Sequence, residues 1–485
     1  MTSAGVSDAV APPPVLSRAD RTVIGVLLVA TFVVILNETI MGVALPVLLD
    51  ELKVTAAVGQ WLTAGFLLTM SVVIPITGFL IQRFSTKALF GAAMGLFSVG
   101  TFIAAVAPGF EVLLAARVVQ ASGTAIMLPL LMTTVMTLVP AERRGAVMGN
   151  ISIVISVAPA IGPTVSGVVL DLWGWRAMFW VVLPIALAAM ALGLRFVSPV
   201  GERSDAPIDP VSVVLSVFGF GGLVYALSSI GHSGGSASVT LWVSLAVGVV
   251  GIVAFVLRQV SLQRADRALL DLRTFGVRTF TITSVLMMVM MGLLLGVATI
   301  LPIYIQNVLK LEPLTTGLLL LPGGLLMGLL SPFVGRLYDK VGPRILLIVG
   351  TVATSASLWF ATTFTSTTAA GFVLAFHLLL SLGLAFSFTP LFSAGLGSLP
   401  MRLYSHGSAV FATTQQLAAA AGVALLVSVM SARAAGLAAS GDAAGAEMGG
   451  IHTAMLLAAA LSLVAVVGAF VIKGGKAETP AGAAH

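Results

Sequence analysis

The chain has 485 residues, of which 58% are hydrophobic and only 9% are charged, and its mean hydropathy is +1.11. Soluble domains carry about 25% charged residues, so this chain has too little polar surface to cover a water-soluble globule. The net charge of +6 does not indicate nucleic-acid binding, because the basic residues lie between apolar segments rather than in a stripe. The absence of cysteine excludes thiol chemistry, disulfides and cysteine-based metal sites.

The apolar segments predict an all-α membrane protein with fourteen transmembrane helices, because each is near the roughly 20 residues that a span requires. The first apolar run is too long for the core of a cleavable signal peptide, so we expect none. The first six predicted spans are 23–49, 58–81, 88–107, 112–138, 145–170 and 176–197. Two more are 210–230 and 239–260, and the last six are 279–308, 314–335, 343–363, 369–396, 406–432 and 451–473.

The loop charges predict the orientation of these spans. Most of the 24 Lys and Arg residues fall in alternate connections, on the same side as the N-terminal tail. The positive-inside rule therefore favours an even number of spans with both termini in the cytoplasm. We expect a multi-pass protein of a bacterial inner membrane, with polar cytoplasmic tails at 1–22 and 474–485.

Two connections repeat one another at corresponding places along the chain. Gly78–Lys87 follows the second span, and Gly335–Arg344 follows the second of the last six spans. Both place a glycine at a helix end and a leucine two residues later, before basic residues such as Arg83. Internal repeats of this kind build the two rocking halves of many transporters. We therefore predict an N-terminal six-helix bundle over 23–197, an insert of two spans over 198–278 and a C-terminal six-helix bundle over 279–473.

The second copy resembles the signature loop of the major facilitator superfamily. The resemblance implies a charged latch at the cytoplasmic face, formed by Asp339 with Arg336 and Arg344. The first copy departs from the family pattern, since Gln82 stands where the family usually has Asp. A latch in the first half is therefore in doubt.

Other stretches resemble further motifs of the same superfamily. Arg117–Gly123 is similar to its RxxQG motif, and Ala158–Gly167 is similar to its antiporter motif, with Ser166 replacing a glycine. Leu36–Pro46 and Trp175–Phe179 resemble the fourteen-helix drug:H+ antiporter branch. The closest resemblance, at Phe79–Thr86, at Leu403–Gly407 and at the Gln415-Gln416 pair, is to the lincomycin-resistance subgroup.

Glu38 is the most informative residue, because it lies about halfway along the first predicted span. An ionised carboxylate at that depth costs about 2.5–3.5 kcal/mol, so it will be neutral, face a wet cavity or pair with a cation. We expect Glu38 to bind and release the coupling proton or to recognise a cationic substrate. The alternative is a cavity-facing residue that only tunes solvation.

Arg117 is the other isolated charge within a span. An arginine does not release its proton in proteins, so we expect Arg117 to approach Glu38 and to tune its charge. The alternative is a structural arginine bonded to backbone carbonyls. Gln120 lies one helical turn further along and completes the predicted network.

The remaining candidates have mechanical or cavity-lining roles. The Gly162-Pro163 pair predicts a kink, with Gly167 allowing close packing, and the resemblance associates this segment with export. The candidate cavity-lining residues are Asn37, Gln60, Gln415, Gln416 and His377, each of which could instead make an interhelical hydrogen bond.

These observations favour a proton-driven exporter of small lipophilic or cationic molecules that works as a monomer by alternating access. We expect no cofactor, no metal and no ATP, because no Walker sequence occurs. We expect no enzymatic activity, because the spans hold no catalytic constellation. The open alternatives are a dedicated exporter of one metabolite or lipid, a membrane-embedded enzyme and a channel.

Overall fold

The computed structural model describes residues 16–59, 61–200, 208–232, 239–440 and 445–472, and the secondary structure of this part of the chain is entirely helical. An α-helix pairs its own backbone N–H and C=O groups, and a spanning segment must do so because lipid offers these groups no hydrogen-bond partner. The helices before the insert are α1 (Arg18–Glu51), α2 (Ala56–Gly59), α3 (Trp61–Arg83), α4 (Thr86–Ala105), α5 (Phe110–Leu138), α6 (Arg144–Trp173) and α7 (Trp175–Phe196). The insert contains α8 (Pro210–Ser216), the π-helical turn η2 (Val217–Gly221), α9 (Gly222–His232) and α10 (Val239–Leu262). The last helices are α11 (Arg278–Ile303), α12 (Pro313–Val341), α13 (Pro343–Ala361), α14 (Ala370–Gly397), α15 (Tyr404–Ala439) and α16 (Ala446–Val471).

Each of the fourteen predicted spans corresponds to one of these helical segments. Thirteen of the described helices are long and apolar enough to cross a membrane, and the bent α6 brings the number to 14. Several helices run past the predicted ends because they project beyond the most apolar stretch; α15, for example, continues to Ala439.

The signature segment is mostly helical, so its prediction as a loop is wrong. Helix α12 continues through Gly335, Arg336 and Asp339 to Val341. The chain turns at Gly342, whose φ of 77° suits a residue without a side chain. Arg344 then lies in the first turn of α13. The first copy behaves in the same way, with Gly78 and Arg83 inside α3.

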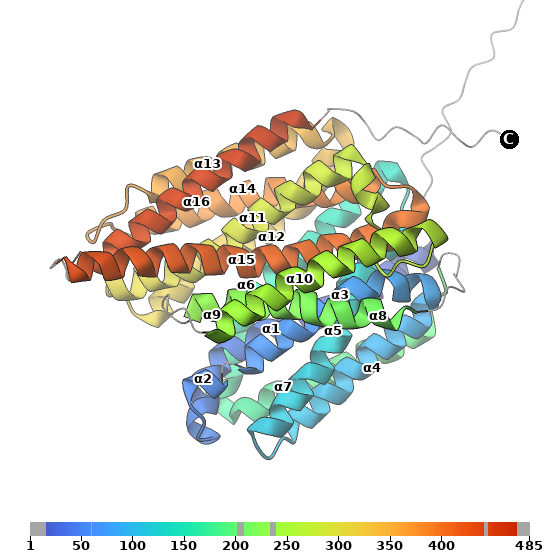
Figure 1. Ribbon diagram of the computed structural model, residues 1–485, viewed down its shortest axis with the longest axis horizontal. Coiled ribbons are helices and arrows are strands. Elements are labelled where there is room, and N and C mark those ends of the chain that lie inside the picture. The colour runs from blue at the N-terminus through green and yellow to red at the C-terminus, as the bar shows by residue number, and fades with distance from the viewer. Residues whose placement is uncertain (1–15, 60, 201–207, 233–238, 441–444, 473–485) are drawn as a thin grey trace, which may run out of the picture.

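The helices form two groups with the insert along the seam between them (Figure 1). Helices α1 and α3–α7 pack on one another, as do α11–α16. The groups meet mainly along two crossings, α6 with α12 and α3 with α15, and α5 with α15 and α6 with α14 make smaller contacts. Helix α1 begins at the same end of the bundle at which α16 finishes (Figure 1). This end is called the termini end below, and the opposite end is called the far end.

The insert is a tightly packed hairpin. A Cβ on Gly219 would lie 2.8 Å from the backbone nitrogen of Ile252, and one on Gly248 would lie 2.5 Å from that of Leu223. Small residues allow helices to approach this closely in a membrane. The insert binds α3 through a Ser216 hydroxyl that donates to the Val72 carbonyl at 3.1 Å.

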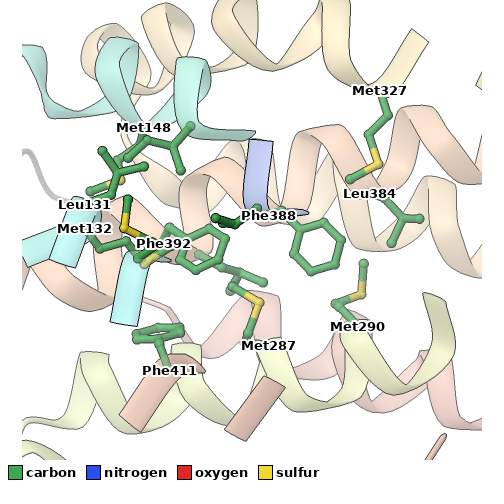
Figure 2. Packing of buried hydrophobic residues seen from close by; sticks show 14 of the residues in the cluster. Leu131, Met132, Met148, Met287, Met290, Met327, Leu384, Phe388, Phe392 and Phe411 are labelled. Carbon is green, nitrogen blue, oxygen red and sulfur yellow. The ribbon is translucent and has the colours of Figure 1, made fainter. Parts of the chain in front are cut away.

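The interior between the two groups is rich in methionine and phenylalanine. Figure 2 shows side chains from α5, α6, α11, α12, α14 and α15 facing one another. Met287 and Met290 of α11 are fully buried, and Phe388 of α14 and Met327 of α12 are nearly so. Methionine is flexible and polarizable, so this interior can repack around differently shaped neighbours.

Candidate functional site

Glu38 lies in the middle of α1, between buried Asn37 and buried Ile40. Its own side chain is half-buried. No described residue forms a hydrogen bond or ion pair with its carboxylate, although Arg117 is near enough to interact with it electrostatically. An unpaired carboxylate at this depth is costly, which is characteristic of a functional position.

Arg117 is 1% exposed and is held by neighbours other than Glu38. Its guanidinium donates to the Gln120 side-chain oxygen at 2.6 Å and to the Leu62 carbonyl at 3.5 Å, and it lies 4.0 Å from the centre of the Phe66 ring. Gln120 in turn donates to the Thr101 hydroxyl at 2.8 Å. These contacts join α5 to α3 and α4, so Arg117 has a structural role whatever its effect on Glu38.

The polar candidate residues differ in whether their side chains have hydrogen-bond partners. The His377 ring is bonded to the Leu320 carbonyl at 2.9 Å, which joins α14 to α12. Gln415 donates to the Phe411 carbonyl within its own helix at 3.2 Å. The amide nitrogen of Asn37 is buried without a partner among the described residues. Gln416 is half-buried, and Gln60 lies outside the described residues.

The chain bends by 42° within α6, between the segments Ala141–Pro159 and Thr164–Trp173, around the Gly162-Pro163 pair that predicts a kink. Gly162 makes room for α1 there, because an added Cβ would meet the hydroxyl of Thr39. Ser166 follows and donates to the Ile40 carbonyl at 3.0 Å. A Cβ on Gly167 would have nothing within 4 Å, so the close packing predicted for it is absent. The side chain of Pro163 lies outside the described residues.

Asp339 caps a helix of the other group. Its two carboxylate oxygens accept the backbone N–H groups of Gly145 at 2.8 Å and Ala146 at 2.9 Å, in the first turn of α6. Those groups have no acceptor within the helix, and a negative charge is favoured beside them. Arg143, at the N-cap position, supplies no side-chain acceptor.

The predicted arginine partners of Asp339 lie elsewhere. Arg336 and Arg344 are both exposed, and neither forms an ion pair with Asp339 among the described residues. The latch at this crossing is therefore a carboxylate on a helix N-terminus rather than a set of paired charges.

Small residues let α6 and α12 touch backbone to backbone at the termini end. A Cβ on Gly335 would lie 2.1 Å from the Gly145 carbonyl oxygen, and one on Gly149 would lie 2.5 Å from that of Ser331. Sequence reasoning identified Gly335 but missed Gly145, Gly149 and Ser331. Their spacing of four residues on each helix is the signal that could have revealed them.

The α3–α15 crossing uses weaker groups. The Gln82 amide donates to the Arg402 carbonyl at 3.1 Å, just before α15 begins. A Cβ on Gly78 would lie 3.2 Å from both the Ala409 side chain and the His406 backbone. This crossing is thus looser than the one between α6 and α12, and it has no carboxylate at the Gln82 position.

The loop from the insert to α11 packs beside this crossing. The buried Gln259 side chain accepts from the backbone of Leu269 at 2.8 Å and donates to the Ser212 hydroxyl at 2.8 Å. Asp271, 3% exposed, pairs with Arg273 and interacts electrostatically with His406 of α15. The insert is therefore fixed to α15 as well as to α3.

Comparison with known proteins places this arrangement in a family. The family model of the Major Facilitator Superfamily matches residues 27–423. The chain is 41% identical to an uncharacterized MFS-type transporter, YcnB of Bacillus subtilis, over 95% of this chain and 96% of the relative. It is 40% identical to the lincomycin resistance protein LmrB of the same organism, over 84% of each chain.

The fold agrees with this match. The crystal structure of the human organic anion transporter MFSD10 superposes with a TM-score of 0.68 at 14% identity, covering 94% of this chain and 100% of the other. At that identity the likeness concerns the fold alone. Together with the family model, it accounts for the two helical groups and their crossings. The chain therefore belongs to the major facilitator superfamily and is a multi-pass membrane protein.

Proposed function

We propose that this protein exports small lipophilic or cationic compounds in exchange for protons, by alternating access, in the cytoplasmic membrane of a bacterium. The similarity to LmrB, whose name records lincomycin resistance, supports export of a drug-like cargo. Both termini face the cytoplasm in this proposal, so the termini end is the cytoplasmic end. Monomeric function is part of the proposal, because each chain contains both helical groups.

The observation that carries the proposal is the unpaired carboxylate of Glu38. Burying a carboxyl group in a low-dielectric setting costs little free energy when the group is neutral and much more when it is ionised. Water admitted from one side, or a cationic cargo beside it, reverses that preference by solvating or pairing the charge. Opening to either end lets Glu38 exchange a proton with that side, so it takes one from the more acidic far side and releases it at the termini end, where a cationic cargo pairs with the charge.

The remaining polar residues support this cycle without carrying the proton. Arg117 keeps a fixed positive charge near Glu38, and its bonds to Gln120 and Leu62 hold that charge in place. The bend of α6 and the latch of Asp339 give the two groups a closed arrangement at the termini end. Opening that end requires the two Asp339 hydrogen bonds to break.

The test is transport by purified protein in proteoliposomes with an imposed pH gradient, with lincomycin and ethidium as cargo. We expect saturable, gradient-driven accumulation, lost by at least about tenfold in Glu38→Gln because the amide binds no proton. The matched control is Asp50→Asn, which removes an exposed carboxylate from the end of the same helix and should retain transport. Unchanged proton-dependent transport by Glu38→Gln would refute the role of Glu38. Non-saturable flux would indicate a channel, and a chemically altered cargo would indicate an enzyme.

A further inference from the structure

A groove lies between the insert and α3, where η2 and α9 pack beside that helix (Figure 1). Its volume is about 290 Å³, just below the range of about 300–1,000 Å³ that is usual for sites of drug-sized ligands. The lining residues come from α3, η2, α9 and α10 and are all uncharged: Leu68, Val217, Phe218, Gly221, Gly222, Tyr225, Val243, Ser244 and Val247. The groove therefore suits a slender, mainly apolar occupant.

The mouth of this groove opens to lipid rather than to water. Phe218 of η2 and Val243 of α10 both line it, and they are 56% and 54% exposed. Both belong to segments that are long and apolar enough to cross a membrane, Pro210–Ser229 and Val239–Ala265. Within such a span the solvent that reaches an exposed side chain is the hydrocarbon of the bilayer. A lipid acyl chain is thus the occupant that the surroundings supply.

The groove forms where the first helix of the insert changes its pitch. The turn η2 is π-helical, and single turns of this kind inside an α-helix are frequent at functional sites. Gly222, just after it, lets α10 approach, because an added Cβ would lie 3.0 Å from the Gly248 nitrogen. Gly221 points towards α3 instead, where a Cβ would meet the Leu68 side chain at an ordinary contact distance of 3.4 Å. The space beside Gly221 is therefore left open rather than taken up by α3.

Two hydroxyl groups line this otherwise apolar groove. Tyr225 of α9 and Ser244 of α10 are both half-buried, and neither hydroxyl forms a hydrogen bond with a described residue. A hydroxyl group without an acceptor is unfavourable in hydrocarbon. The ester carbonyls of a glycerophospholipid are hydrogen-bond acceptors and lie at the head of its acyl chains. The groove therefore matches a phospholipid better than it matches a plain hydrocarbon.

The Trp61–Tyr225 pair marks the end of the groove nearest water. The two rings stack with their centres 5.6 Å apart, and Trp61 is the first residue of α3, at the far end of the protein. Tryptophan and tyrosine are enriched at the level of the lipid headgroups. From Tyr225 the groove extends to Val217, eight residues earlier and roughly 12 Å deeper along the helix. An acyl chain that enters from the far-end leaflet thus passes the tyrosine first.

We propose that the groove between α3 and the insert is a phospholipid site, which takes one acyl chain from the far-end leaflet while Tyr225 and Ser244 donate to the ester carbonyls. The bound chain fills the space beside Gly221 and so holds the insert against α3. The site lies outside the methionine-rich interior, so it is separate from the transport pathway. The inference does not depend on the proposed export function, and it gives the two additional spans a ligand of their own.

Native mass spectrometry of the whole protein in detergent tests the site, with palmitoyl-oleoyl phosphatidylcholine as the probe. We expect one molecule of this lipid to stay bound at detergent concentrations that remove the rest. Ser244→Phe fills the groove and should weaken this binding about tenfold. The matched control is Val250→Phe, on a residue of α10 that is 68% exposed and does not line the groove. Equal retention of lipid by the two variants would overturn the site.

A second measurement addresses the two hydroxyl groups and adds no bulk to the groove, so it stands even where Ser244→Phe does not fold. The diether analogue of the same phosphatidylcholine lacks the ester carbonyls. We expect the parent chain to bind it about fivefold more weakly than the ester lipid, because the hydrogen bonds are lost. The double variant Tyr225→Phe, Ser244→Ala should bind both lipids equally. A preference for the ester lipid that survives in the double variant would overturn the assigned role of these hydroxyls.

Photo-crosslinking then locates the retained lipid. A phosphatidylcholine with a diazirine in one acyl chain should label peptides that contain Val217–Tyr225 or Val243–Val247 before any other lipid-facing segment. Even labelling of all lipid-facing helices would show only a general lipid coat and would overturn the site. Labelling of Met287 or Phe388 would place the lipid in the interior as cargo and would also overturn it.

Discussion

The two crossings between the helical groups hold the same end of the protein together by different means. Between α6 and α12, Asp339 binds two backbone N–H groups and glycines place the backbones in contact. Between α3 and α15, a neutral amide from Gln82 binds one carbonyl. The second crossing has gained a third element, because the insert binds both of its helices.

This difference shows how a repeated motif can lose a charge without losing its place in the fold. A hydrogen bond to a charged group contributes about 1.5–3 kcal/mol, whereas a neutral one contributes about 0.5–1.5 kcal/mol. At the α3–α15 crossing the insert adds contacts that the other crossing does not have. The two crossings are therefore not equivalent, since the insert packs on the helices of only one of them.

The largest expected effect comes from filling the glycine contact at one crossing. Gly335→Ala places a Cβ 2.1 Å from a backbone oxygen of α6, so the two helices must move apart. Such overpacking costs about 1–3 kcal/mol, which moves a two-state population by about fivefold to about 150-fold. The measurement is the alkylation rate of a cysteine placed at Ser152, which contacts Thr389 of the other group at 2.9 Å. Gly78→Ala is the matched change at the other crossing, where the contacts of 3.2 Å require only a small shift. Faster alkylation in Gly78→Ala than in Gly335→Ala would reverse our ranking of the two crossings.

A smaller effect is expected when the polar groups of the latches are changed. Asp339→Asn removes the charge and one of the two acceptors, so we expect alkylation at position 152 to rise about tenfold. Gln82→Leu removes one neutral, partly exposed bond and should raise it by less than about threefold. Asp339→Glu retains the charge and serves as the control for shape. If Asp339→Asn and Gln82→Leu were equivalent, the charge of Asp339 would contribute nothing to closure.

The smallest expected effect concerns the stability that one ion pair gives to the insert, and how that stability depends on pH. Hydrogen bonds from Arg258 hold the pKa of Asp209, which precedes the first span of the insert, at about 2. Because this pKa is lowered, the ion pair contributes stability above the ordinary pKa of 3.8, and that stability is lost as the pH falls through about 2. Asp209→Asn should therefore lower the melting temperature in detergent by the same amount at every pH between about 5 and 8. If the loss in melting temperature changed with pH between about 5 and 8, another titrating group would have to act in the insert. A flat difference would exclude this ion pair as the source of any pH-dependent transport.

Much of the fold could be predicted from the sequence, because lipid imposes simple rules on a spanning chain. Apolar length located the spans, and the repeat at Gly78 and Gly335 predicts equivalent helices on either side of the insert. The role of Asp339 was only partly predictable. Its place in a latch followed from family resemblance, but its partners are backbone N–H groups of α6, which carry no mark in the sequence.

Glu38 stood out in the sequence because a carboxylate in an apolar run is rare, and that rarity follows from the cost of its charge in hydrocarbon. Its lack of a partner, the attachment of Arg117 to Gln120 and the cover that α9 gives to one seam were decided by the tertiary structure. The physical reason is how far apart along the chain the interacting residues lie. Hydropathy and helix formation depend on neighbours along the chain, whereas pairing, sealing and opening depend on which helices, far apart in sequence, come to lie side by side.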